Sequence, residues 1–158
     1  MEIPSVIAID GPAGSGKSTL GALLAERLGY LYFDTGVMYR ALTLAALRSD
    51  LDLSDANALE QLAAQIDISI HPAADAAPGQ NIIYIDREDV TAEIRRPEVE
   101  QCVSLVACHP GVRREMVRQQ RAIGLRGQVV MVGRDIGTVV MPDAGLKLFL
   151  DASLTARA

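Results

Sequence analysis

Short apolar runs alternate along this chain with longer segments whose apolar residues recur at helical spacing. Four such runs of four or five mostly apolar residues occupy positions 6–10, 30–33, 129–132 and 146–150, and two of them include a charged residue, Asp10 and Lys147. Continuous apolar runs of this length are typical of strands that are buried on both faces of a sheet. Strands that are separated by helices predict a parallel, doubly wound α/β core with helices on its flanks.

The segments between these runs carry the signals of helices. The helical pattern covers residues 17–28, 37–48, 55–65, 98–108 and 111–125. Gly29 suits the left-handed residue that follows a helix, and Ser54 can cap the start of the third helix. Pro110 suits the first turn of the last helix. Beyond the final strand, Ser153 would cap one more helix that begins at Leu154.

One stretch of the chain departs from the α/β alternation. Isoleucines alternate with polar residues over positions 66–70, which predicts a half-exposed strand. A loop rich in Pro, Ala and Gly follows, and further short strands are expected at residues 81–86 and 89–90 with a turn at Arg87-Glu88. We therefore expect one domain over residues 1–158, with a small antiparallel sheet inserted at about residues 66–93.

Composition narrows the class of protein. With 158 residues, of which 49% are hydrophobic and 22% charged, the chain suits one globular domain with a real core. A net charge of −5 argues against a basic surface for nucleic acid. The sequence has neither an apolar run of 18 residues nor a basic flank at its start, so we expect no membrane span or signal peptide. We expect a cytoplasmic protein in which Cys102 and Cys108 are buried, reduced thiols.

The most informative motif lies between the first strand and the first helix. Gly11 and Gly16 are separated by four residues and are followed by Lys17 and Ser18. Backbone N–H groups at a helix start, together with the helix dipole, suit a polyphosphate. Lys17 would reach the β and γ phosphates of ATP, and the Ser18 hydroxyl would bind Mg²⁺. A simple glycine turn is the alternative. The residues expected to bind ATP are Gly11, Pro12, Ala13, Gly14, Ser15, Gly16, Lys17, Ser18 and Thr19.

Polar residues follow the carboxyl end of every predicted strand. In open α/β sheets ligands bind along this edge, so the polar residues would converge on one site. Such a convergence favours an enzyme over a protein that only holds a nucleotide. The residues at the strand ends are Asp10, Asp34 with Thr35, Arg134 with Asp135, and Asp151.

Three motifs together resemble those of the nucleoside monophosphate kinases, most closely the bacterial cytidylate kinases. They are the glycine loop at residues 11–18, the turn at residues 34–36 with Tyr39-Arg40, and Gly133-Arg134-Asp135. The resemblance covers essentially the whole chain. It implies a P-loop kinase-type sheet and transfer of the ATP γ-phosphoryl group, with Mg²⁺, to CMP or dCMP. We also expect a monomer that binds neither nucleic acid nor membrane.

The resemblance assigns roles to individual residues. Lys17, Arg134 and Asp135 would be catalytic. Arg134 and Arg40 would hold the acceptor phosphate, and Thr35 would lie near the sugar. A carboxylate such as Asp135 can accept a hydrogen bond from the cytosine amino group, and an arginine can donate to O2 or N3. The residues that would bind the acceptor are Thr35, Arg40, Ser104, Arg113, Arg134 and Asp135.

These assignments differ in how much the residues themselves support them. Arg40 could instead belong to a solvated helix face, and Arg134 with Asp135 could be a loop pair in solvent. Arg113 lies near a helix start, where the dipole disfavours a cation, which hints at a ligand. The assignment of Ser104 rests on the resemblance alone.

The sequence departs from the family pattern in two places. Val132 stands where the family usually has Asp or Glu, an acid that commonly helps to hold Mg²⁺ through water. We therefore expect a raised Mg²⁺ requirement, unless Asp10 or Asp135 takes over. The family also continues through an arginine-bearing lid, so we expect the 158-residue chain alone to turn over slowly.

Two other functions stay open on the sequence alone. The first is a P-loop kinase that phosphorylates another small acceptor. The second is a nucleotide-binding module without transfer activity. Acceptor preference separates the first from a cytidylate kinase, and monophosphate binding separates the second.

Overall fold

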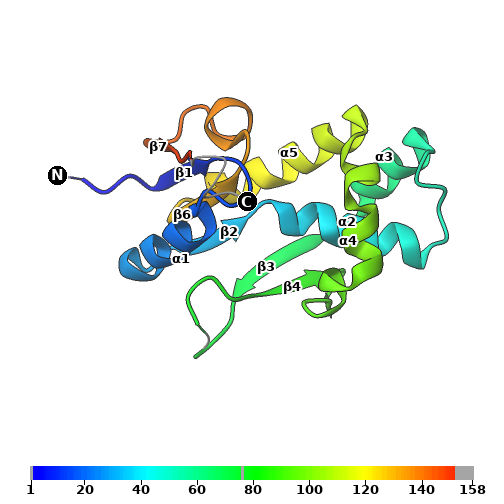
Figure 1. The fold of residues 1–158 in the computed structure, drawn as a ribbon, viewed down its shortest axis with the longest axis horizontal. Coiled ribbons are helices and arrows are strands. Elements are labelled where there is room, and N and C mark those ends of the chain that lie inside the picture. The colour runs from blue at the N-terminus through cyan, green and yellow to red at the C-terminus, as the bar shows by residue number, and fades with distance from the viewer. Residues whose placement is uncertain (1, 76, 152–158) are drawn as a thin grey trace. The chain divides into compact units, whose positions relative to one another are not determined.

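The computed structural model describes residues 2–75 and 77–151, which divide into two compact units (Figure 1). Unit 1 contains the described residues of Met1–Thr35, Pro72–Gln80 and Gln120–Ala158. Unit 2 contains Gly36–His71 and Asn81–Gln119. The expected cap at Ser153 and the helix after it lie outside the described residues.

The five predicted helices are present and begin and end close to the expected residues. Gly29 follows the first helix with φ 69°, the left-handed conformation that glycine adopts without steric cost. The expected cap at Ser54 is wrong, because the Asp55 side chain accepts the N–H of Ala58 at 3.1 Å, while Ser54 bonds to Asp52. The helices are α1 (Lys17–Leu28), α2 (Gly36–Arg48), α3 (Ala56–Gln65), α4 (Pro97–Ala107) and α5 (Pro110–Leu125).

A four-stranded parallel sheet forms the centre of unit 1 and confirms the predicted α/β core. Its strands lie in the order β2-β6-β1-β7 (Figure 1). Asp10 pairs with Gly133 and Asp34 with Val132, so the carboxyl ends of β1, β2 and β6 lie along the same edge. The strands are β1 (Val6–Asp10), β2 (Leu31–Asp34), β6 (Val129–Gly133) and β7 (Leu146–Phe149).

Alternating side chains of β6 carry the packing on the two faces of this sheet. On one face Val132 packs beneath α1. A Cβ on Gly21 of that helix would lie 2.6 Å from a Val132 methyl carbon, so glycine permits the close approach. On the other face Met131 meets the last turn of α5, where a Cβ on Gly124 would lie 3.0 Å from the Met131 sulfur. The sheet is thus covered on both faces, as a parallel sheet requires.

The last strand of unit 1 differs from its prediction. The apolar run at residues 146–150 predicts a buried strand, but Leu146 is 39% and Phe149 is 70% exposed. Within the described residues, β7 is the edge strand of the sheet and pairs with β1 alone. Apolar composition therefore does not distinguish an edge strand from a central one here.

Unit 2 combines helices with a separate three-stranded sheet in the order β3-β4-β5, which confirms the inserted sheet. The β4–β5 pair is antiparallel, and its turn lies at Asp86-Arg87 rather than at the expected Arg87-Glu88. Buried isoleucines such as Ile70 and Ile83 form the apolar face of this sheet. The strands are β3 (Ile68–Pro72), β4 (Asn81–Ile85) and β5 (Glu88–Asp89), followed by a short 3-10 helix, η1 (Glu93–Arg95).

Two further predictions concern the environment of the protein. Both cysteines are free, but neither is fully buried, since Cys102 is half-buried and Cys108 is exposed at the end of α4. Across residues 2–75 and 77–151, none of the helices has the length and apolar character needed to cross a membrane.

Candidate active site

The glycine motif forms a loop between β1 and α1 in unit 1, as predicted, and we call residues 11–18 the phosphate loop. Gly14 and Gly16 have φ values of 76° and 88°, which favour glycine. At Gly11 the reason for glycine is space. A Cβ there would lie 2.4 Å from the Leu150 carbonyl oxygen, so a side chain would displace the end of the neighbouring strand.

The start of α1 presents backbone donors rather than side-chain caps. Gly16 occupies the cap position without a side-chain hydrogen bond, and the first turn carries no acidic residue. The first N–H groups of a helix have no partner within the helix, and the helix dipole adds positive charge at this end. The same turn carries the exposed side chains of Ser18 and Thr19. This geometry suits an anion that carries several oxygens.

Two polar side chains of the phosphate loop are available for a ligand. The Lys17 ammonium donates to the Pro12 carbonyl oxygen at 3.1 Å, an interaction that a phosphate oxygen could replace. The Ser15 hydroxyl is buried and finds no hydrogen-bond partner among the described residues. A buried polar atom without a partner is costly, and a bound phosphate would supply one.

The donors near this loop limit how Mg²⁺ can bind. No group of three or more His, Cys, Asp or Glu side chains that could hold a metal occurs in the described part of the chain. Mg²⁺ often binds through very few protein ligands and takes its remaining oxygens from phosphates and water. The exposed hydroxyl of Ser18 fits that role.

The second predicted motif follows β6, and we call residues 133–138 the Gly-Arg-Asp loop. Arg134 is exposed, and its guanidinium has no hydrogen bond or ion pair within the described residues. Asp135 is half-buried and precedes a short π-helical turn, η2 (Ile136–Val140), where the sequence predicted only a loop. Such turns are rare and often occur at functional sites.

Thr35 lies against the start of this loop. Its hydroxyl donates to the Val132 carbonyl oxygen at 3.1 Å, and the residue is buried. A Cβ on Gly133 would lie 2.6 Å from that hydroxyl oxygen, so Gly133 leaves room for Thr35. The phosphate loop, Thr35, Arg134 and Asp135 thus all belong to unit 1 and lie at the carboxyl ends of its strands.

Two residues, Asp10 and Arg121, hold the π-helical turn, and the sequence analysis named only Asp10. Asp10 was expected on the ligand-binding edge, but its carboxylate accepts the N–H groups of Ile136 at 2.7 Å and Gly137 at 2.8 Å. At the other end, the Arg121 guanidinium donates to the carbonyl oxygens of Val139 at 2.8 Å and Val140 at 2.9 Å. Partners more than 100 residues apart, as for Asp10, leave no local pattern in the sequence.

Val132, the position where the family usually has an acid, is fully buried. Its side chain belongs to an apolar cluster with Ile7, Ile9, Ala25 and Val130 beneath α1. The valine is therefore well accommodated as a core residue, and it offers no oxygen to a metal.

The other three predicted acceptor-binding residues belong to unit 2. Arg40, on α2, forms an ion pair with Glu100, on α4. The hydrogen bond and the charge of Arg40 hold the pKa of Glu100 below its usual value. Ser104 is exposed on α4, and Arg113 is exposed in the first turn of α5. Their roles in binding the acceptor stay predictions.

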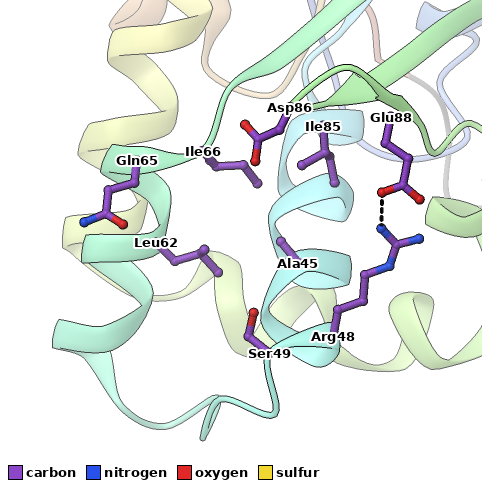
Figure 2. Close-up of a pocket in the computed structure, with 9 residues that line it drawn as sticks. All are labelled: Ala45, Arg48, Ser49, Leu62, Gln65, Ile66, Ile85, Asp86 and Glu88. Carbon is purple, nitrogen blue, oxygen red and sulfur yellow. Dashed lines mark hydrogen bonds and ion pairs between the residues drawn. The ribbon is translucent and has the colours of Figure 1, made fainter.

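Two of the surface pockets differ in their relation to the predicted site residues. One, of about 430 Å³, lies in unit 2 and contains none of the predicted site residues (Figure 2). Apolar side chains such as Leu62 and Ile85 line it, and the ion pair between Arg48 and Glu88 at 3.0 Å stands at its rim. The other, of about 440 Å³, lies in unit 1 and is bordered by Ser18 and other residues of α1.

Comparison with known proteins identifies relatives along the whole chain. The family model for cytidylate kinase matches residues 7–158. A cytidylate kinase of Chloroflexus aggregans is 62% identical over 158 residues, which make up 100% of this chain and 69% of that protein. A cytidylate kinase of Roseiflexus castenholzii is 58% identical over 159 residues, with 100% and 68% covered.

A third relative joins this type of chain to another enzyme. The bifunctional pantoate ligase/cytidylate kinase of Synechococcus sp. is 51% identical over 153 residues. The match covers 97% of this chain and 28% of that longer protein. The similarity thus extends over nearly the same residues of this chain in separate and in fused relatives.

Proposed function

The chain belongs to the cytidylate kinase family, and from that premise we propose how its residues transfer the γ-phosphoryl group of ATP to CMP or dCMP. It is an ATP-dependent nucleoside monophosphate kinase, and the products are ADP with CDP or dCDP. One observation carries the assignment of ATP, namely the phosphate loop that ends in an uncapped helix start. Backbone donors at this place need no rearrangement to meet phosphate oxygens.

ATP binds with its β and γ phosphates in the phosphate loop. The Lys17 ammonium exchanges the Pro12 carbonyl oxygen for phosphate oxygens and so brings a positive charge to the transferred group. The orphaned Ser15 hydroxyl gains a partner in the same exchange. In phosphoryl transfer the protein mainly positions the groups and neutralises their charge, so these contacts account for most of what the loop must do.

The Ser18 hydroxyl would hold Mg²⁺ bound with ATP, and phosphates and water would supply its other oxygens. When bound, the ion neutralises charge on the phosphates. Val132 adds no ligand to this set, which is why we propose a raised Mg²⁺ requirement.

CMP binds through arginines and through the Gly-Arg-Asp loop. Arg134 is already exposed and unpaired among the described residues, so its guanidinium can grip phosphate oxygens in the bidentate manner that arginine favours. Arg40 must first leave Glu100, and the phosphate of CMP takes the place of that carboxylate. Asp135 accepts from the cytosine amino group, Arg113 and Ser104 add further contacts to the base, and Thr35 lies near the sugar.

The test is ADP release, measured by a coupled assay with a panel of acceptors. CMP and dCMP should be phosphorylated, whereas UMP, AMP and shikimate should support much less turnover because each leaves polar groups of the site without their hydrogen-bond partners. Faster turnover with another acceptor would contradict the assignment. Calorimetric titration separates the remaining alternative, because a module that only binds nucleotides would bind ATP without binding CMP.

A further inference from the structure

The carboxylate of Asp10 is a charged group inside unit 1 that the proposed mechanism does not use. Asp10 is only 7% exposed and ends the central strand β1, directly before the phosphate loop. Among the described residues it forms no ion pair. A buried carboxylate is costly unless hydrogen bonds compensate it, so its partners indicate its purpose.

Both oxygens of this carboxylate accept backbone N–H groups from one short segment. Oδ1 accepts from Ile136 at 2.7 Å and Oδ2 accepts from Gly137 at 2.8 Å. These two amides open the π-helical turn and follow Arg134 and Asp135 directly in the chain. A negative charge at such an N-terminus is favourable, and charge-assisted hydrogen bonds are stronger than neutral ones.

The backbone around Asp10 is itself firmly held. The Asp10 carbonyl oxygen accepts the N–H of Leu150 at 2.8 Å, and the next residue, Gly11, donates to Gly133 at 3.2 Å. Asp10 therefore sits on a rigid strand between two neighbours, and its side chain reaches across to the loop beyond β6. An anchor on a held strand restrains the loop that it binds, and catalysis is sensitive to displacements of about 1 Å.

The limited space around Gly137 also indicates that the Asp10 carboxylate lies close to the backbone of this loop. A Cβ at Gly137 would lie 3.3 Å from Oδ2 of Asp10 and 3.2 Å from the Lys147 side chain. Any side chain would therefore crowd the carboxylate, so the glycine lets Asp10 approach the backbone closely. Only a carboxylate of this length offers two acceptors, because an asparagine replaces one of them with a donor.

We propose that Asp10 is a positioning residue whose carboxylate fixes the Gly-Arg-Asp loop and so presents Arg134 and Asp135 to the acceptor nucleotide. The inference rests on the proposed function, because it assigns those two side chains to the acceptor. It connects the strand that leads into the phosphate loop with the loop that reads the acceptor. In this assignment the hydrogen bonds accepted by its two oxygens serve the loop and not the metal.

The test compares Asp10→Asn with the parent protein in two measurements. Calorimetric titration should show CMP affinity reduced by about 10- to 100-fold and the preference for CMP over UMP narrowed, with a much smaller change for ATP. Hydrogen exchange should show loss of protection at the Ile136 and Gly137 amides. The matched control is Asp52→Asn, because Asp52 also accepts two hydrogen bonds, from the Ser54 N–H and hydroxyl, on the exposed surface of unit 2.

A second variant, Gly137→Ala, still tests the proposal if Asp10→Asn does not fold. Gly137→Ala leaves the carboxylate and both amides in place but pushes a methyl group against Oδ2. CMP affinity and the preference for CMP over UMP should each fall by about two- to tenfold. Unchanged CMP affinity and unchanged CMP preference in the folded variants would overturn the proposal. A raised Mg²⁺ requirement with intact CMP binding would also overturn it, since it would assign Asp10 to the metal.

The two measurements keep this inference apart from the proposed function. If the parent protein neither binds nor phosphorylates CMP, the proposed function is wrong. Amide exchange at Ile136 and Gly137 then decides on Asp10 alone. Protection that survives Asp10→Asn refutes the anchor, and protection that is lost supports it.

Discussion

The phosphate loop of unit 1 and the arginine-bearing helices of unit 2 offer opposite kinds of group to the anionic ligands that we propose for them. The loop offers backbone N–H groups at an uncapped helix start, and glycines hold its shape. Unit 2 offers side chains on helices, and one of them, Arg40, is already paired with Glu100. Backbone donors cannot be withdrawn, whereas a side chain can be occupied by a competing partner. The first region is therefore preorganised, and the second must exchange a partner when its ligand binds.

The Gly-Arg-Asp loop stands between these two cases. The groups that we propose to bind its ligand are side chains, Arg134 and Asp135, but the backbone that carries them is held from both ends. Asp10 binds the first amides of the π-helical turn, and Arg121 binds its last carbonyl oxygens. The anionic Asp10 lies at the start of the turn and the cationic Arg121 at its end, which matches the direction of the turn's dipole. Arg134 and Asp135 are therefore carried by a backbone that is restrained next to them, although they are side chains.

The largest effect is expected when the one charged side chain of the phosphate loop, that of Lys17, is removed. Lys17→Met should lower kcat by about 100- to 1000-fold, because it removes positive charge from the transferred phosphoryl group. CMP affinity should stay unchanged. Coupled ADP release and a CMP titration measure the two effects, with Arg118→Met on the exposed face of α5 as control. A loss of CMP affinity without a loss of kcat would show that Lys17 serves the acceptor.

A smaller effect is expected at the base-reading side chains. Asp135→Asn should reduce the ratio of kcat/KM for CMP to that for UMP by about 10- to 100-fold, because the amide no longer discriminates donors from acceptors. Ser104→Ala in unit 2 should change the same ratio less, since one hydroxyl contact is lost. Equal ratios in the Asp135→Asn variant and the parent protein would move base recognition away from the Gly-Arg-Asp loop.

Val132→Asp tests whether position 132 serves only the apolar core or can also serve the metal site. Placing a carboxylate in the apolar cluster beneath α1 should lower the free energy of unfolding by about 1 to 3 kcal/mol. If an acid at this position helps to hold Mg²⁺, the Mg²⁺ concentration for half-maximal activity should fall as well. Thermal unfolding and a Mg²⁺ titration of ADP release measure the two effects. An unchanged Mg²⁺ dependence would refute the raised requirement of the parent protein.

The smallest effect is expected from freeing Arg40. If Arg40 binds the CMP phosphate as we propose, Glu100→Gln removes a competing carboxylate, so CMP affinity should rise by about threefold. The pKa of Glu100 is lowered by Arg40, so the pair is present at neutral pH and is lost only as the pH falls below the usual carboxylate range. The gain should therefore be clear at pH 7 and shrink at acidic pH. CMP titrations at several pH values check this, and a weaker affinity at pH 7 would contradict it.

Local signals in the sequence were sufficient for the preorganised region. The spacing of Gly11 and Gly16, the helix that begins at Lys17 and the stop at Gly29 all follow from glycine conformation and helix termini. The parallel α/β core was predicted and is confirmed, but the order of its strands was not predicted, because four apolar runs predict a parallel sheet without ranking its strands. That is why the exposure of Phe149 on the edge strand was missed.

Long-range partners explain what the sequence did not reveal about the site. The hydrogen bonds of Asp10 cross more than 100 residues of sequence, and Arg40 meets a carboxylate 60 residues away. Neither has a local pattern, because each exists only after the chain has folded. The π-helical turn after Asp135 likewise depends on anchors from β1 and α5, so its residues alone read as a loop. A lone serine such as Ser104 could be singled out by resemblance alone.

The most direct test of the whole account is a crystal structure with CMP and a non-hydrolysable ATP analogue. The account predicts the triphosphate on the N–H groups of the phosphate loop with Lys17 turned toward it, and the CMP phosphate on Arg134 and on an Arg40 released from Glu100. It also predicts the carboxylate of Asp10 still on the amides of Ile136 and Gly137. A structure with CMP bound away from these arginines, or with Asp10 coordinating the metal, would contradict it.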